Sequence, residues 1–260
     1  MIDPREKQVL ADLITIVKVL NLPTILVGAG ARLIICDPKI FGEGRSTTDW
    51  DFAVSINSWE SYQKLSKALI DGDPPIFEST KTAHRFKHIE TDIDVDIVPF
   101  GAIGEPDKQI TWDSTGNTMS VLGFEEALFH AKTEIIDGLQ IQVINIPSFI
   151  VLKIFAWGDR GEKTNKDLED IEFILSKYED DDRVYNELVE ELYSEAVKLS
   201  DAGIYLLGQD ICKMLQDKTL IELNKLLGKM IEKFDDDEER SLGYRLKILH
   251  KGINSINPRK

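Results

Sequence analysis

DWDFAVSI, residues 49–56, alternates polar and apolar side chains in the way of a β-strand. Residues two apart in a strand point to the same face, with their Cα atoms about 7 Å apart. Asp49 and Asp51 therefore direct two carboxylates to one point, which is costly unless a cation lies between them. Magnesium is the natural cation, because it prefers oxygen ligands and is commonly held by a few carboxylates and substrate phosphates. The alternative is an exposed edge strand whose acids face water, with Trp50 in the core.

A second acidic strand is predicted within ETDIDVDIVPFG, residues 90–101. Asp92, Asp94 and Asp96 alternate with apolar residues, so one face is acidic and the other is apolar. A half-buried strand with one face in water gives the same pattern. Aspartate is a poor strand former, however, and three in one strand favour a bound cation that offsets their repulsion. With residues 49–51, these acids supply ligands for a two-metal site, whose ions lie about 3.5–4 Å apart.

Two glycines in VGAGAR, residues 27–32, follow a predicted buried strand at 24–27 and precede a predicted helix. Gly28 and Gly30 allow backbone amides to approach phosphate oxygens, and a helix N-terminus favours anions. The spacing matches neither the dinucleotide pattern GxGxxG nor the P-loop pattern GxxxxGK[ST]. A tight turn without a ligand is the alternative.

Helical patterns fill the second half of the chain. A long helix begins at Pro147, a further helix covers 167–178, and only helical patterns follow residue 180. The earlier part mixes strands and helices. We therefore expect an α+β fold, in which a small mixed sheet flanked by helices occupies residues 1–146 and a helical region packed on it occupies residues 147–260.

Charged side chains are clustered in the first two of these helices. A group of cations beside an acidic metal site suits a triphosphate, and the candidates are Lys153, Arg160 and Lys166. The alternative is a helical hairpin with solvated charges. Asp167 and Asp170 lie one turn apart, and an acid in the first turn of a helix complements the helix dipole.

A basic run lies just before the second acidic strand. It contains His84, Arg85, Lys87 and His88. The run would receive the phosphate of an acceptor or of a nucleotide, or it is only surface.

Composition limits the classes of partner. Among 260 residues, 31 Lys and Arg stand against 46 Asp and Glu, and the net charge of −15 disfavours a protein that coats nucleic acid or lies on an anionic membrane. Cys36 and Cys212 form no CxxC pair, which favours a reducing compartment. The sequence shows no apolar run of roughly 20 residues and no signal peptide at its start. We expect a cytoplasmic protein with no membrane partner.

The order of these motifs resembles the DNA polymerase β-like nucleotidyltransferase superfamily. The loop RSTT at 45–48 is similar to the R-x-T-x-D entry of its small bacterial members, and VDIVPFG at 95–101 is similar to their third-carboxylate strand, which selects Asp96 over Asp94. LKIFAWGDR at 152–160 and KDLEDI at 166–171 resemble blocks of the AbiEii/AbiGii-type toxin nucleotidyltransferases. The resemblance covers roughly residues 24–178. Many relatives have Ser where this chain has Ala29, so a hydroxyl contact to phosphate is missing.

The resemblance implies a role for each motif residue. It implies that Mg²⁺ or Mn²⁺ is held by three carboxylates, those of Asp49, Asp51 and Asp96. Lys153 and Asp167 would also be catalytic, so residues 147–178 would contribute to the active site. The nucleotide would be bound by six further residues: Gly28, Gly30, Arg45, Thr48, Arg160 and Lys166.

The implied reaction is transfer of NMP from an NTP to a hydroxyl. The acceptor would be an RNA 3′ end, such as that of tRNA, or a protein. The chain would be the toxin of a toxin–antitoxin or phage-defence system, with an antitoxin as partner. One alternative is an inactive nucleotidyltransferase fold that serves as a binding or regulatory protein, which Ala29 supports and the intact acids oppose. Another is a phosphohydrolase that uses the same ions on water.

Overall fold

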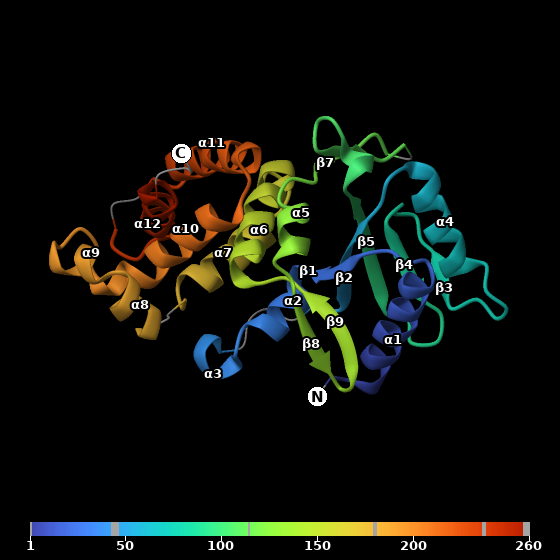
Figure 1. Cartoon of the computed structure of the whole chain (residues 1–260). Coiled ribbons are helices and arrows are strands. Elements are labelled where there is room, and N and C mark those ends of the chain that lie inside the picture. The colour runs from blue at the N-terminus through green and yellow to red at the C-terminus, as the bar shows by residue number, and fades with distance from the viewer. Residues whose placement is uncertain (1, 43–46, 114, 179–180, 236–237, 257–260) are drawn as a thin grey trace. The chain divides into compact units, whose positions relative to one another are not determined.

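The computed structural model describes residues 2–42, 47–113, 115–178, 181–235 and 238–256, and within them seven strands form one mixed sheet (Figure 1). The strand order is β3-β4-β5-β2-β1-β9-β8. The strands are β1 (Thr24–Val27), β2 (Asp49–Ser55), β3 (Phe77–Ser79), β4 (Arg85–His88), β5 (Asp94–Phe100), β8 (Lys132–Ile136) and β9 (Leu139–Val143). Helices precede and follow these strands, so the expected α+β class is confirmed.

The register of β2 and β5 decides where the acids lie. The two strands are parallel, with Asp49 opposite Asp94 and Asp51 opposite Asp96. Since alternate residues of a strand share a face, all four carboxylates belong to one face of the sheet. The other face is apolar and buried at Val95 and Ile97, among others.

The acidic strand is shorter than the sequence pattern predicts. Asp92 has a φ of 62° and lies in the turn between β4 and β5. Its carboxylate is largely exposed and accepts a hydrogen bond from Lys87 at 2.9 Å. Asp92 therefore does not belong to the acidic face, because its left-handed backbone closes the turn that precedes β5.

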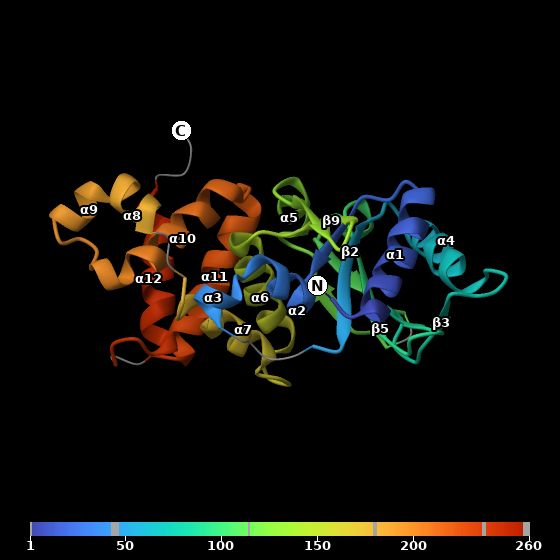
Figure 2. The same ribbon diagram turned by 90° about the horizontal axis from the view of Figure 1, so that it is seen from below.

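Helices and a small hairpin complete this part of the chain. α1 (Pro4–Val19) begins at the N-cap Asp3 with a capping box to Glu6, and it lies beside α4 (Trp59–Ile70) (Figures 1 and 2). The apolar stripe of α1 is buried, which explains its helical spacing in the sequence. The remaining elements are α2 (Gly28–Ile35), η1 (Ala102–Gly104), β6 (Gln109–Thr111), β7 (Thr118–Ser120) and α5 (Phe124–Phe129).

The later part of the chain is helical, as the sequence predicts. Its elements are α6 (Ile146–Arg160), α7 (Lys166–Leu175), α8 (Asp181–Glu187), α9 (Val189–Tyr193), η2 (Leu199–Asp201), α10 (Ala202–Met214), α11 (Asp217–Lys233) and α12 (Leu242–Ser255). The short helix α3 (Pro38–Phe41) comes earlier in the chain, between α2 and β2. α10 and α12 pack backbone against backbone. The packing is so close that a Cβ at Gly252 would overlap the carbonyl of Tyr205. No helix in the described ranges is both long and apolar enough to cross a membrane.

The chain divides into two units. The sheet unit comprises residues 1–37 and 44–149, and the helical unit comprises residues 38–43 and 150–260. The aspartates of β2 and β5 belong to the sheet unit, whereas Lys153 and Asp167 belong to the helical unit.

Candidate active site

A guanidinium group lies among the carboxylates of the sheet unit. Arg85 stands opposite Asp96 in the antiparallel pair of β4 and β5, so its side chain reaches the acidic face. Its Nε and Nη2 donate to the two oxygens of Asp96, each at 2.7 Å. Nη2 also donates to Asp49 Oδ2 at 3.0 Å, and Nη1 approaches Asp94 Oδ2 at 3.5 Å. One cation therefore bridges three of the four acids.

The surrounding charges keep Arg85 ionised. Its hydrogen bonds to Asp96 hold the pKa of the guanidinium above its ordinary value, and the charges of Asp96, Asp49 and Asp94 add to this effect against the cost of burial. Arg85 is only about one-third exposed, and the Asp96 side chain is 13% exposed. The charge-assisted bonds are thus partly shielded from water, which strengthens them.

Gly28 fits against the fourth carboxylate. Val27, the last residue of β1, stands opposite Asp51, and the chain turns at Gly28 with a φ of 66°. A Cβ at Gly28 would overlap the carboxylate of Asp51. The glycine therefore supplies both the left-handed conformation and the room that Asp51 needs.

Gly30 has a different neighbour. A Cβ there would lie 2.7 Å from Cε3 of Trp50, whose ring is buried in the core, as the sequence predicts. Gly30 is thus required for the packing of α2 on β2, and its role in binding the nucleotide stays a prediction.

The loop before β2 supports Asp49. Thr47 Oγ1 donates to Asp49 Oδ1 at 2.7 Å, whereas the neighbouring Thr48 is exposed. Thr47, which the sequence analysis gives no role, is the residue at the threonine position of the R-x-T-x-D pattern, and the role of Thr48 stays a prediction. Arg45 lies outside the described residues.

A second charged cluster is buried in the helical unit. Lys153 Nζ on α6 lies 2.7 Å from Asp170 Oδ2 and 3.3 Å from Asp167 Oδ1 on α7. Arg160 makes a two-pronged contact with Asp167, through Nε at 2.7 Å and Nη2 at 2.9 Å. Both carboxylates and Lys153 are buried, and Arg160 is 54% exposed.

Two opposing effects act on Asp167. Burial alone would raise the pKa of its carboxyl, but the hydrogen bonds from Arg160 and the charge of Lys153 outweigh burial and hold the pKa below the ordinary value of 3.8. Asp167 is therefore ionised at neutral pH and accepts from two cations. Lys166, at the start of α7, is exposed.

The acids on β2 and β5 suit a divalent ion in their chemistry. Carboxylate oxygens are the ligands that Mg²⁺ prefers, and Asp94 Oδ1 is a buried oxygen with no hydrogen-bond partner among the described residues. In the described part of the chain, no three His, Cys, Asp or Glu side chains are already arranged around one ion position. The Arg85 guanidinium bonds to oxygens of Asp49, Asp94 and Asp96, which are the oxygens that an ion would need. The donor set therefore fits a metal, in competition with Arg85.

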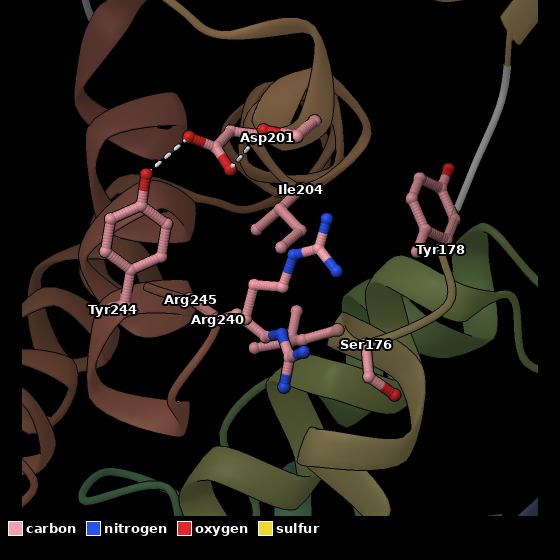
Figure 3. Close-up of a pocket in the computed structure, with 9 residues that line it drawn as sticks. Ser176, Tyr178, Asp201, Ile204, Arg240, Tyr244 and Arg245 are labelled. Carbon is pink, nitrogen blue, oxygen red and sulfur yellow. Dashed lines mark hydrogen bonds between the residues drawn. The ribbon is translucent and has the colours of Figure 1, made fainter. Parts of the chain in front are cut away.

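A pocket of about 240 Å³ lies in the helical unit (Figure 3). It is enclosed by the end of α7, the start of α10 and the start of α12. The lining residues are Leu175, Ser176, Tyr178, Ser200, Asp201, Ile204, Arg240, Tyr244 and Arg245. The sequence analysis assigned none of them a role.

Comparison with known proteins adds a family and several similar structures. The model of the family "Nucleotidyl transferase AbiEii toxin, Type IV TA system" matches residues 39–245. No curated protein matches the sequence. A nucleotidyltransferase-like antigen from Paracoccidioides brasiliensis is 16% identical, with a TM-score of 0.49, covering 93% of this chain and 92% of its own.

Two further structures are similar at lower scores. JHP933 from Helicobacter pylori is 15% identical, with a TM-score of 0.31, over 93% of this chain and 90% of its own. The CCA-adding enzyme of Thermotoga maritima, solved with tRNA, is 12% identical, with a TM-score of 0.27, over 96% of this chain and 79% of its own. The assignment rests on the family model, which spans both charged clusters and confirms the resemblance. The chain belongs to the AbiEii toxin family of type IV toxin–antitoxin systems and is a nucleotidyltransferase.

Proposed function

We propose that the chain transfers an NMP from an NTP to a hydroxyl group, at the acidic face of β2 and β5. The observation that carries this proposal is the strand register, which puts Asp49 opposite Asp94 and Asp51 opposite Asp96. Four like charges on one face are costly unless cations lie among them. Arg85 supplies one positive charge among them, so the face remains negatively charged and attracts a divalent ion with its anionic ligand.

Three carboxylates would hold Mg²⁺ or Mn²⁺: those of Asp49, Asp51 and Asp96. The ion, when bound, supplies positive charge to the triphosphate and lowers the pKa of the acceptor hydroxyl. Thr47 fixes the orientation of Asp49 through its hydrogen bond of 2.7 Å. Gly28 leaves the space in which the Asp51 carboxylate lies.

The helical unit would contribute a positioning pair and two exposed cations. Lys153 is neutralised by Asp167 and Asp170, so we assign it with Asp167 to a buried network that fixes the α6–α7 hairpin. Arg160 and Lys166 are solvent-accessible enough to meet phosphate, and we keep both as nucleotide-binding residues. We also place Thr48 in that group, together with Arg45, which lies outside the described residues.

Labelling tests the reaction and identifies the acceptor. The wild type and Asp49→Asn are incubated with each α-labelled NTP, Mg²⁺, and either total RNA or soluble protein. We expect one macromolecular fraction to acquire label with the wild type and at least about a hundredfold less with Asp49→Asn, in line with loss of a charged catalytic group. Equal labelling by the two proteins would refute the site.

The acceptor is an RNA 3′ end or a protein hydroxyl, and the toxin family implies an antitoxin partner. The excess of acidic residues favours an acceptor that docks locally over a long nucleic acid that is wrapped.

An inactive scaffold is the competing candidate, and one observation favours it: Arg85 already neutralises Asp96. Calorimetric titration with each NTP and Mg²⁺ separates the two. Heat that depends on both ligands supports the enzyme, and its absence supports the scaffold.

A further inference from the structure

We propose that Arg85 competes with the divalent ion for the site and thereby makes ion and nucleotide bind cooperatively. This inference rests on the proposed function, because it concerns the ion and nucleotide of that same site.

The competition follows from the distances. Arg85 occupies both oxygens of Asp96 at 2.7 Å and one oxygen of Asp49 at 3.0 Å. A magnesium ion binds carboxylate oxygens at about 2.0–2.1 Å. An ion held by Asp49 and Asp96 would need the oxygen lone pairs to which the guanidinium now donates, so the two cations would compete for the same oxygens.

Arg85 does not neutralise the site completely, so a divalent ion can still compete with it. It neutralises only one of the four carboxylates on the face, and Lys87, the next cation on β4, bonds to Asp92 in the turn. The site therefore keeps a negative charge that attracts a second cation. The Arg85 side chain is 32% exposed, so part of it faces solvent.

The nucleotide can compensate the displaced guanidinium. A phosphate group accepts two parallel hydrogen bonds from a guanidinium, as a carboxylate does. If the ion binds alone, Arg85 loses its carboxylate partners. If the ion binds with a triphosphate, the phosphate oxygens would replace those partners. Each ligand then raises the affinity for the other, and this coupling must be reciprocal.

Manganese titration followed by electron paramagnetic resonance tests the inference. We compare the wild type, Arg85→Gln and the control Lys87→Gln, which removes the same charge two residues along β4. Without nucleotide, we expect Arg85→Gln to bind Mn²⁺ at least about tenfold more tightly than the wild type, and Lys87→Gln less than about threefold more tightly. With a non-hydrolysable NTP analogue, the advantage of Arg85→Gln should shrink or reverse.

Several outcomes are decisive. Equal or weaker Mn²⁺ binding by Arg85→Gln overturns the inference, and so does an equal gain in Lys87→Gln, which would indicate a general charge effect. If circular dichroism shows that Arg85→Gln is unfolded, Arg85→Lys replaces it, with a smaller gain expected because Lys lacks the two-pronged contact.

Asp49→Asn separates this inference from the proposed function. If the wild type binds Mn²⁺ and Asp49→Asn does not, a failure at Arg85 leaves the proposed function standing. If the wild type binds no Mn²⁺ even with the analogue, both claims fail.

A different observation carries a second inference: we infer that the pocket of the helical unit binds a phosphate group. Arg245 is only 16% exposed, and its ion pair within the described residues is a long one of 3.8 Å to Glu172. A mostly buried charge requires close partners. Figure 3 shows Arg240 and Arg245 with their guanidinium groups in the space between α12 and the residues Ser176 and Tyr178.

The acid in the pocket wall is already engaged. Asp201 accepts from the Tyr244 hydroxyl at 2.6 Å and from Ser200 Oγ at 3.2 Å. Two guanidinium groups that face a small polar pocket match the oxygens of a phosphate in shape and charge. Arg245 is mostly buried and Arg240 is exposed, so the pocket offers an anion one guanidinium group on its inner side and one at its solvent side.

Calorimetry in EDTA tests the pocket without the metal-dependent site. The probes are inorganic phosphate, 5′-AMP and a short oligoribonucleotide, and the variants are Arg245→Gln, Arg240→Gln and the control Lys247→Gln on α12. We expect each arginine variant to weaken phosphate binding at least about fivefold and the control to leave it unchanged. Tighter binding of 5′-AMP identifies a free nucleotide as the source of the phosphate, and tighter binding of the oligonucleotide identifies a nucleic-acid backbone. Equal affinity in the wild type and both arginine variants overturns the inference.

Discussion

Asp51 leaves no room for a side chain at Gly28, and this contact joins the end of β1 to the acidic face. Replacing Gly28 by Ala adds a Cβ that overlaps the carboxylate, at a backbone φ of 66° that L-residues rarely adopt. We expect Gly28→Ala to lower the free energy of unfolding by about 2–4 kcal/mol and to abolish transfer. Urea denaturation measures the first effect and NTP labelling the second.

Gly138→Ala provides the matched control. Gly138 also has a positive φ, of 88°, but a Cβ there meets nothing within 4 Å. The free energy of unfolding of Gly138→Ala should therefore fall only by the strain of the left-handed backbone, about 1–2 kcal/mol. If Gly28→Ala is no less stable than Gly138→Ala, the contact with Asp51 contributes nothing.

Asp167 gives the stability of the chain a pH dependence. Its pKa is depressed in the folded chain, because the hydrogen bonds from Arg160 and the charge of Lys153 outweigh the effect of burial. The stability that the carboxylate contributes is fully present above its unfolded-state pKa, near 3.8, and is lost as the pH falls through the lower folded-state pKa.

We expect Asp167→Asn to destabilise the chain by about 2 kcal/mol at neutral pH and to flatten the loss of stability in acid. Urea denaturation from about pH 7 to about pH 3 measures both effects. The exposed Asp92→Asn serves as the control and should follow the wild type. An unchanged acid limb in Asp167→Asn would contradict the assignment.

At the scale of elements, α10 and α12 are held together by close backbone contact. A Cβ at Gly252 would overlap the carbonyl of Tyr205, and backbone atoms cannot rotate aside as a side chain can. We expect Gly252→Ala to lower the free energy of unfolding by about 1–3 kcal/mol, which urea denaturation measures.

Gly228 on α11 should respond in the opposite direction. A Cβ there meets nothing within 4 Å, and alanine is the better helix former. Gly228→Ala should therefore stabilise the chain by about 0.5–1 kcal/mol. Equal destabilisation of both variants would show that the α10–α12 contact does not explain the effect of Gly252→Ala.

Other elements show how far local pattern predicts structure. α1 follows its capping residue Asp3 and its apolar spacing, because both signals act within a few residues. β5 does not follow its pattern as far, since Asp92 turns out of the strand. The alternation of acids continues through that turn, and alternation alone does not specify where a ladder begins.

At the scale of the whole molecule, the sequence indicated the carboxylates but not their counter-ion. Asp49, Asp51 and Asp96 were recognisable because each motif is local. Arg85 was noticed only as part of a basic run, since its place opposite Asp96 depends on the pairing of β4 with β5. Thr47 had a signal in the R-x-T-x-D pattern, whereas the buried Asp94 oxygen had none.

The sequence by itself determined the α+β class, the helical second half, the family and the acidic motifs, because periodicity, capping and motif spacing are properties of short segments. Only the tertiary structure decided that Arg85 bridges three acids, that Lys153 is neutralised by Asp167 and Asp170, and that Arg240 and Arg245 share a pocket. These arrangements depend on strand register and helix packing, which bring together residues from separate elements.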